Sequence, residues 1–119
     1  MGKILIVDDA LFMRRVIQGI LKEGGYSDLL EAPDGGSAVE VFREERPELV
    51  ILDITMPGLD GIETLRRIKE IDKDAKIVMC SAIGQEKHMM KAVAMGAAEY
   101  VVKPFKPEAL LNVIRKVIG

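Results

Sequence analysis

The 119-residue chain predicts an α/β fold in which five strand–helix units build one parallel sheet with helices on both faces. Two observations predict it. Short apolar runs such as Ile4-Leu5-Ile6-Val7 lack the alternation of a half-exposed strand, which is typical of strands buried on both faces. Segments with helical periodicity separate these runs, and the short connections between them suit right-handed β-α-β crossovers.

Five strands are expected from the apolar runs. They cover residues 3–7, 27–31, 49–53, 76–80 and 99–102. The second strand contains fewer apolar residues than the others and is therefore more polar. We therefore expect it at an edge of the sheet, where one side of a strand meets solvent.

Five helices are expected between and after the strands. They cover residues 11–23, 37–45, 61–71, 85–95 and 107–118. The first carries two adjacent apolar rows, Phe12, Val16, Ile20 and Met13, Ile17, Leu21. Chain breaks are expected at Gly24-Gly25, Pro33-Asp34-Gly35, Pro47 and Pro57-Gly58. Pro107 suits the first position of the last helix, because proline is tolerated in a first turn.

Composition narrows the class of protein. Hydrophobic residues make up 49% of the chain, which excludes a disordered protein, and 119 residues suit one domain with a real core. The net charge of −2 gives no reason to expect nucleic acid or an anionic membrane as a partner. The first strand starts too early for a signal peptide, and no apolar run could span a bilayer. A single cysteine, Cys80, excludes an internal disulfide and fits the cytoplasm.

Four of the strands run into side chains that can do chemistry. Asp8-Asp9 follow the first strand, Asp53 ends the third, Ser81 follows the fourth and Lys103 follows the fifth. In parallel sheets, ligands bind at the carboxyl ends of the strands, where the strand order reverses. We therefore expect three carboxylates, a hydroxyl and an ammonium at one edge of the sheet.

That set of groups suits a divalent cation and a phosphoryl group. Carboxylates crowded together repel unless a cation lies between them, and Mg²⁺ prefers oxygen ligands. Asp53 is the best nucleophile candidate, since a carboxylate can attack phosphorus. Each residue also has a purely structural interpretation: Asp8-Asp9 as helix caps, Asp53 as a turn residue, Ser81 as a strand end and Lys103 as a surface lysine. Their coincidence at four strand ends favours the site.

Three other residues are interpreted as structural. Asp60 should cap the third helix, Cys80 should be a buried small side chain, and His88 should lie on the solvent face of the fourth helix.

Several segments spread along the chain resemble those of a known family. The matching segments are Ile6-Val7-Asp8-Asp9 with Met13-Arg14, the run from Asp53 through Met56-Pro57-Gly58 to Gly61, Ser81-Ala82, and Gly96-Ala97-Ala98-Glu99-Tyr100 leading to Lys103-Pro104-Phe105. Together they resemble the receiver domains of response regulators, most of all the single-domain receivers of chemotaxis. The resemblance implies a flavodoxin-like sheet of strand order 2-1-3-4-5, an order we adopt on that precedent.

The resemblance implies a Mg²⁺-dependent phosphoryl site. Asp53 would be the phosphoacceptor. Asp9 and Asp53 would bind Mg²⁺ directly, together with the backbone carbonyl of Thr55, and Asp8 would act through water.

It also implies how the phosphoryl group is sensed. Lys103 and Ser81 would contact the group, and the Lys103-Pro104 bond would be cis. Tyr100 would be the switch residue that turns inward when Ser81 moves toward the phosphate.

The partners implied are those of a signalling switch. A phosphohistidine on a sensor kinase would be the donor, and a phosphatase is a possible further partner. Such domains catalyse their own phosphorylation and dephosphorylation and are not turnover enzymes. We expect residues 1–119 to be a receiver without an output domain, with the flagellar motor switch as target. Val113 stands where receivers of the largest DNA-binding class carry arginine for dimerisation, which favours a monomer.

Other functions stay open from the sequence. The chain could be a phosphorelay intermediate or the isolated receiver of a larger regulator. A haloacid-dehalogenase-type phosphatase also uses an aspartate nucleophile, but it needs a second aspartate where Thr55 stands. A flavodoxin-type flavin carrier would have a first loop rich in hydroxyls, whereas Asp8-Asp9 would repel the flavin phosphate.

Overall fold

The computed structural model describes residues 2–55 and 60–119, and it contains five strands and five helices in strict alternation within that part. The strands are β1 (Ile4–Val7), β2 (Leu29–Ala32), β3 (Leu49–Asp53), β4 (Ile77–Ala82) and β5 (Glu99–Lys103). The helices are α1 (Leu11–Glu23), α2 (Gly35–Glu45), α3 (Gly61–Ile71), α4 (Glu86–Ala94) and α5 (Pro107–Ile118). The predicted α/β fold is therefore confirmed.

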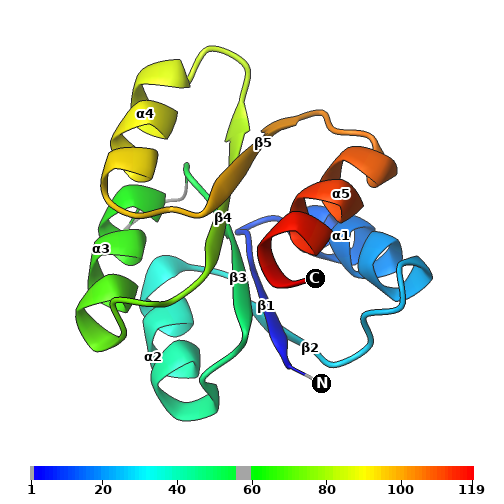
Figure 1. Ribbon diagram of the computed structural model, residues 1–119, viewed down its shortest axis with the longest axis horizontal. Coiled ribbons are helices and arrows are strands. Elements are labelled where there is room, and N and C mark those ends of the chain that lie inside the picture. Colours follow the sequence, from blue (N-terminus) through cyan, green and yellow to red (C-terminus); the bar gives the residue numbers. More distant parts are fainter. Residues whose placement is uncertain (1, 56–59) are drawn as a thin grey trace.

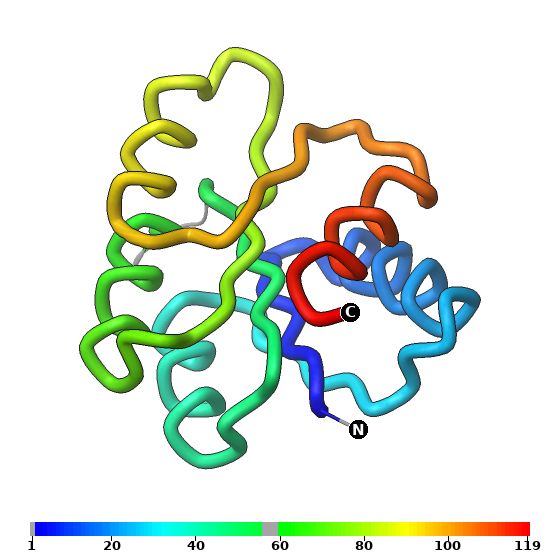
Figure 2. Tube along the Cα trace, in the orientation of Figure 1, coloured from blue at the N-terminus to red at the C-terminus, as the bar shows by residue number. Residues whose placement is uncertain are grey.

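The five strands form one parallel sheet in the order β2-β1-β3-β4-β5, as predicted. Helices α2, α3 and α4 cover one face of the sheet, and α1 and α5 cover the other (Figure 1). The chain trace in Figure 2 shows how α1 and α5, from opposite ends of the sequence, lie side by side. The strand order reverses between β1 and β3, which places the ends of these two strands at the crevice where ligands bind in such sheets.

Two apolar cores, one on each face, hold the layers together. Phe42, Leu65 and Met89 from the helices pack on the α2–α4 face. Ile17 and Ile114 pack on the other face. The strands β1 and β3 are buried on both sides and expose almost none of their side chains. This explains why these strands carry uninterrupted apolar runs.

Several boundaries differ from the prediction, each for a local reason. The second helix begins at Gly35 instead of residue 37, because the Asp34 side chain accepts a hydrogen bond of 2.7 Å from the Ser37 amide and so caps it. The second strand covers Leu29–Ala32 and lies at an edge, as expected from its polarity. The fourth strand runs on through Ser81 and Ala82, since Ala82 pairs with Lys103 of β5. The turn predicted at Pro57-Gly58 lies outside the described residues.

The first helix uses only part of its two predicted apolar rows. Ile17, Ile20 and Leu21 are buried, whereas the side chain of Phe12 is 77% exposed and Val16 also lies at the surface. The core face of α1 is therefore narrower at its N-terminal end than the sequence pattern indicates.

Replacing Gly19 with alanine should stabilise the protein. Gly19 lies inside α1, and a Cβ built there meets nothing within 4 Å in the described part of the chain. Glycine costs a helix interior about 0.5–1 kcal/mol relative to alanine, so Gly19→Ala should raise the free energy of unfolding by about that amount. Urea denaturation measures the change, and an unchanged or lower midpoint would mean that this face of α1 is not open.

Cys80 should be chemically inert in the folded protein. Its side chain is 1% exposed in β4, and burial raises the pKa of its thiol to about 12. Only the thiolate attacks a disulfide reagent. We expect the native protein to react with such a reagent far more slowly than the urea-unfolded chain, and comparable rates would show that β4 opens readily.

Candidate functional site

The carboxyl ends of β1 and β3 bring three aspartates together. Val7 pairs with Leu52 in the sheet, so the residues that follow, Asp8 and Asp53, emerge side by side. Oxygen atoms of Asp8, Asp9 and Asp53 all lie within 4.8 Å of one another. Asp8 and Asp53 are buried, at 2% and 8% exposure, and Asp9 faces solvent. This is the acidic cluster that the sequence predicted.

Lys103 reaches the same cluster from the end of β5. Its Nζ donates a hydrogen bond of 2.9 Å to Asp8 Oδ2 and lies 3.5 Å from Asp53 Oδ1. The Lys103-Pro104 bond that follows is cis, as the resemblance implied. The ammonium therefore lies between two buried carboxylates, where it offsets part of their repulsion.

Burial and charge act in opposite directions on these groups. Burial raises the pKa of Asp53, the charge of Lys103 lowers it and the charge of Asp8 raises it, so the pKa lies above its usual range. Burial alone would lower the pKa of Lys103, but its hydrogen bond to Asp8 and the charge of Asp53 raise it above the usual range. Lys103 thus stays protonated. Ionisation of the Asp53 carboxyl costs more free energy in the folded protein than it does in water.

The ends of β3 and β4 add polar groups beside Asp53. The backbone amide of Thr55 lies 3.4 Å from Asp53 Oδ1, a long hydrogen bond. Ser81, in β4, is 1% exposed, and its neighbour Cys80 pairs with Asp53 across the sheet. The four predicted strand ends therefore converge, although Ser81 lies within its strand and does not follow it.

Arg14 supports the acidic turn after β1, a role that the sequence did not predict. Its Nη1 donates a hydrogen bond of 2.7 Å to the carbonyl oxygen of Asp8, and its Nε donates one of 2.9 Å to Glu31 Oε1. The Asp8 side chain in turn accepts a hydrogen bond of 2.9 Å from the Ala10 amide. Arg14 lies in the first turn of α1, so a helix pattern could have indicated that it faces back toward the strand ends.

Gln85 is a second residue that sequence reasoning missed. It was expected to be the first residue of the fourth helix, and it precedes α4 instead. Its side-chain Oε1 accepts a hydrogen bond of 2.7 Å from the Ala82 amide, and its Nε2 donates one to Thr55 Oγ1. A single glutamine in a turn carries no sequence signal that would separate this bridge from an ordinary helix cap.

The donor set at this edge fits a magnesium ion. It consists of carboxylate oxygens on rigid strand ends, open to solvent on the side of Asp9, and Mg²⁺ prefers oxygen ligands and keeps several waters. Lys103 already shows that a positive charge is favourable between Asp8 and Asp53. The acidic cluster is thus compatible with Mg²⁺.

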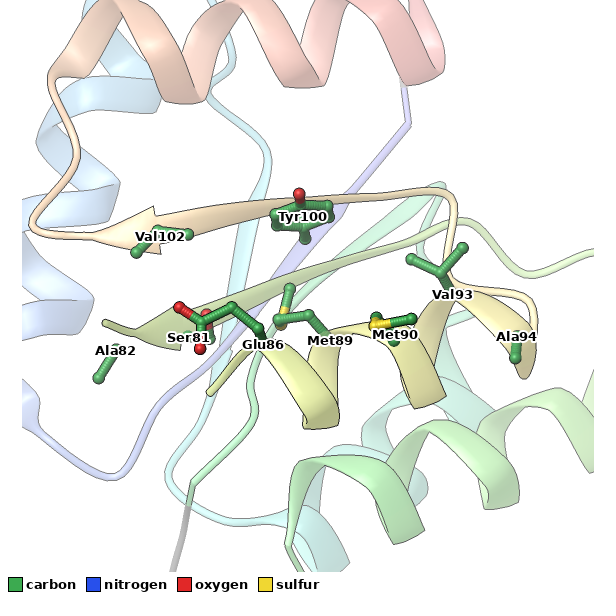
Figure 3. Close-up of a pocket in the computed structure, with 9 residues that line it drawn as sticks. All are labelled: Ser81, Ala82, Glu86, Met89, Met90, Val93, Ala94, Tyr100 and Val102. Carbon is green, nitrogen blue, oxygen red and sulfur yellow. The ribbon is translucent and has the colours of Figure 1, made fainter. Parts of the chain in front are cut away.

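An apolar groove of about 440 Å³ begins at the end of β4 and continues between α4 and β5. Figure 3 shows Ser81 and Ala82 at one end, the side chains of α4 on one side and Tyr100 and Val102 of β5 on the other. Tyr100 is 45% exposed. The same residue, Ser81, therefore borders both the groove and the acidic site.

Asp60 and His88 lie as predicted, and two methionines of α4 differ in exposure. Asp60 caps α3 by accepting a hydrogen bond of 2.9 Å from the Glu63 amide, and His88 is exposed on α4. Met89 is buried, and Met90 is exposed and lines the groove. None of the helices in residues 2–55 and 60–119 combines the length and the apolarity that crossing a membrane demands.

Comparison with known proteins identifies the family of this fold and site. A chemotaxis protein CheY of Bacillus subtilis (strain 168) is 47% identical over 117 residues, 98% of each chain. The corresponding protein of Thermotoga maritima is 44% identical over 118 residues, again 98% of each chain. A crystal structure of a CheX-CheY-BeF3-Mg²⁺ complex from Borrelia burgdorferi matches with a TM-score of 0.93 and 34% identity, over 99% of this chain and 90% of that one.

The family of response regulator receiver domains matches residues 4–115, nearly the whole chain. Its members take part in two-component signalling, and the similarity to chemotaxis proteins extends from end to end. The chain belongs to the response regulator receiver domain family.

Proposed function

We propose that this receiver is a signalling switch in which Asp53 accepts a phosphoryl group from a phosphohistidine of a sensor kinase. The observation that carries the proposal is the position of Asp53. It ends β3 beside Asp8, its carboxylate lies 3.5 Å from the Lys103 ammonium, and Asp9 opens the cluster to solvent. A nucleophile, a cation and a metal-compatible set of oxygens thus share one edge of the sheet.

The chemistry assigned to Asp53 is a displacement at phosphorus. A carboxylate oxygen attacks, an O–P bond forms and the P–N bond of the phosphohistidine breaks. The imidazole nitrogen keeps the electron pair and takes a proton from water. In a second step, a water oxygen attacks phosphorus and forms a new O–P bond while the O–P bond to Asp53 breaks. The Asp53 carboxylate keeps the electron pair, and inorganic phosphate leaves with the protons of the water.

The neighbouring residues bind and orient the group. Asp9, Asp53 and the backbone carbonyl of Thr55 would hold a Mg²⁺ ion, which would supply positive charge against the negative charge on the phosphoryl oxygens. Lys103 supplies a fixed positive charge, and the raised pKa keeps that charge in place. Ser81 can donate its hydroxyl proton to a phosphoryl oxygen. Asp8 holds Lys103 through their 2.9 Å hydrogen bond.

The readout proposed is a change of the groove between α4 and β5. Phosphorylation adds a charge of about −1.5 to −2 and three acceptor oxygens beside Ser81. A movement of Ser81 toward that charge opens space at the end of the groove, into which the half-exposed Tyr100 can turn. The phosphoryl group would thereby shift an existing equilibrium between two states of this surface.

Phosphoryl acceptance is tested with a small donor. The protein is incubated with acetyl phosphate, with Mg²⁺ or with a chelator, and its intact mass is measured. We expect a gain of one phosphoryl group only with Mg²⁺, and the modified peptide should contain Asp53. A protein that gains no phosphoryl group under either condition would contradict the proposal.

We further propose that the output is the flagellar motor switch, on the strength of the end-to-end similarity to chemotaxis proteins. A peptide from the N-terminal segment of a flagellar switch protein should bind more tightly when Mg²⁺ and beryllofluoride, a phosphoryl mimic, are present. Asp53→Asn is the matched control, and its affinity for the peptide should not respond to the mimic. Failure of the wild-type protein to bind in either state would point to a phosphorelay as the alternative output.

A further inference from the structure

Gln85 spans the ends of two strands at the candidate site. Its Oε1 accepts a hydrogen bond of 2.7 Å from the Ala82 amide at the end of β4, and its Nε2 donates one to Thr55 Oγ1 just after β3. Gly84, with φ of +96°, makes the tight turn that returns the chain between Ala82 and Gln85. This left-handed conformation suits glycine and brings the Gln85 side chain back over the strand ends.

The backbone amide of Ala82, which donates its hydrogen bond to Gln85, faces the side of the sheet on which Asp53 lies. Successive residues of a strand direct their backbone groups alternately to the two neighbouring strands. The carbonyl of Cys80 accepts a hydrogen bond of 2.9 Å from the Ile54 amide, so Cys80 faces β3, and Ala82, two residues on, faces the same side. Its N–H therefore points into the space beyond the ends of β3 and β4, where a group carried by Asp53 would lie.

We propose that Gln85 is a built-in competitor of the phosphoryl group for the Ala82 amide. In the free protein, the Gln85 carbonyl holds that amide, and a phosphoryl oxygen on Asp53 must displace it. The inference rests on the proposed role of Asp53. A phosphoryl oxygen is a stronger acceptor than an amide carbonyl, so the exchange is feasible, but the bond given up disfavours the modified state.

The side chain of Thr55 orients the side-chain amide of Gln85 toward the Ala82 N–H. Its hydroxyl accepts from Gln85 Nε2, which fixes the amide plane with Oε1 toward the Ala82 N–H. The backbone amide of the same residue already lies 3.4 Å from Asp53 Oδ1. Loss of the Thr55 hydroxyl should therefore weaken the competition without removing the acceptor.

Displacement of the Gln85 side chain would also affect the groove between α4 and β5. Gln85 is the residue directly before α4, and its own carbonyl accepts a hydrogen bond of 3.1 Å from the Met89 amide in the first turn. Glu86, Met89 and Met90 of that helix line the groove between α4 and β5. A side chain that leaves Ala82 therefore releases the N-terminal end of the helix that forms one wall of the groove.

The role of Gln85 as a competitor can be distinguished from a merely structural role by one measurement. This is the direction in which the affinity for a phosphoryl mimic changes when the Gln85 side chain is removed. If Gln85 only braces the site, its removal loosens the strand ends and weakens the binding of a phosphoryl mimic. If Gln85 competes for the amide, its removal strengthens that binding. The net value of one hydrogen bond corresponds to roughly a two- to tenfold change in affinity.

The experiment measures the affinity for beryllofluoride with Mg²⁺ by calorimetry in the full chain. Gln85→Ala should bind the mimic about two- to tenfold more tightly than the wild-type protein. Gln85→Met, which keeps the length of the side chain, should show the same gain and guards against a simple loss of packing. Lys87→Ala, at an exposed position in the first turn of α4, is the matched control and should not change the affinity. Thr55→Val should give a smaller gain that is not additive with Gln85→Ala.

The amide resonance of Ala82 provides an independent readout. Its NMR shift should differ between the wild-type protein and Gln85→Ala in the free state and should coincide when beryllofluoride is bound. Equal or weaker binding by both Gln85 variants would overturn the competitor role. A wild-type protein that does not bind beryllofluoride would instead overturn the proposed function of Asp53.

Discussion

Asp53→Asn should abolish Mg²⁺-dependent labelling of the protein by acetyl phosphate. The side chain lies at the end of β3 among Asp8, Asp9 and Lys103, and it is the carboxylate that both Lys103 and the Thr55 amide approach. An asparagine amide keeps the shape of the side chain but has no anionic oxygen to attack phosphorus. We expect the mass spectrum of the variant to show no more phosphoryl adduct than a heat-denatured sample.

Asp60→Asn is the matched control for that substitution. Asp60 is exposed and caps α3, and asparagine is an equally good capping residue, so labelling and stability should stay near those of the wild-type protein. Full labelling of Asp53→Asn would move the acceptor to another residue.

The fold should tolerate Asp53→Asn at neutral pH. Burial raises the pKa of Asp53, and the charge of Asp8 raises it further. The charge of Lys103 lowers this pKa, but the net shift is upward. A carboxyl with a higher pKa in the folded than in the unfolded chain makes folding less favourable as the pH rises through that interval. Asparagine removes this loss, so the free energy of unfolding should be at least that of the wild-type protein at neutral pH. The difference should shrink at acidic pH, where the wild-type carboxyl is protonated in both states.

Gly61→Ala should be strongly destabilising. Gly61 begins α3, and its amide donates a hydrogen bond of 2.9 Å to the carbonyl of Ile54 directly after β3. A Cβ at Gly61 would lie 2.5 Å from Ile54 Cα and closer still to the carbonyl oxygen of Asp53. Because both neighbours are backbone atoms, the helix must move away from the strand, at a cost of about 2–3 kcal/mol.

The substitution should also slow phosphoryl acceptance, since the added Cβ presses on the backbone carbonyl of Asp53 itself. Urea denaturation gives the free energy of unfolding, and a time course with acetyl phosphate gives the labelling rate. Gly19→Ala, an identical substitution at an open helix position, should change stability in the opposite sense and leave the labelling rate unchanged. A Gly61→Ala protein as stable as the wild type would mean that α3 can shift at little cost.

The sequence predicted the strands and the acidic cluster well for a physical reason. A strand buried on both faces needs an uninterrupted apolar run. The run Leu49-Val50-Ile51-Leu52 therefore ends only at Asp53, the last residue of β3. Parallel topology then places Asp8, Asp53 and Lys103 at one edge without any knowledge of distances. The bounds predicted for α1, α3 and α5 also match the structure, because glycine or proline residues near these helices mark where they begin or end.

Contacts across loops could not be predicted in this way. Phe12 fits the helical periodicity of α1, yet its side chain is 77% exposed, because no other element of the described chain covers it. Gln85 acts through a side-chain bridge to Thr55, thirty positions earlier in the chain, and no local pattern encodes such a partner. The extension of β4 to Ala82 depends on its pairing with Lys103, which is a property of the sheet and not of the segment.

The ion pair between Asp8 and Lys103 joins residues 95 positions apart. During synthesis the ribosome releases Asp8, Asp9 and Asp53 well before Lys103, and β5 can join the sheet only after that. A nascent chain that has folded only through β4 would hold this acidic edge without the ammonium of Lys103. The charge balance of the edge is therefore completed by β5, the last of the five strands along the sequence.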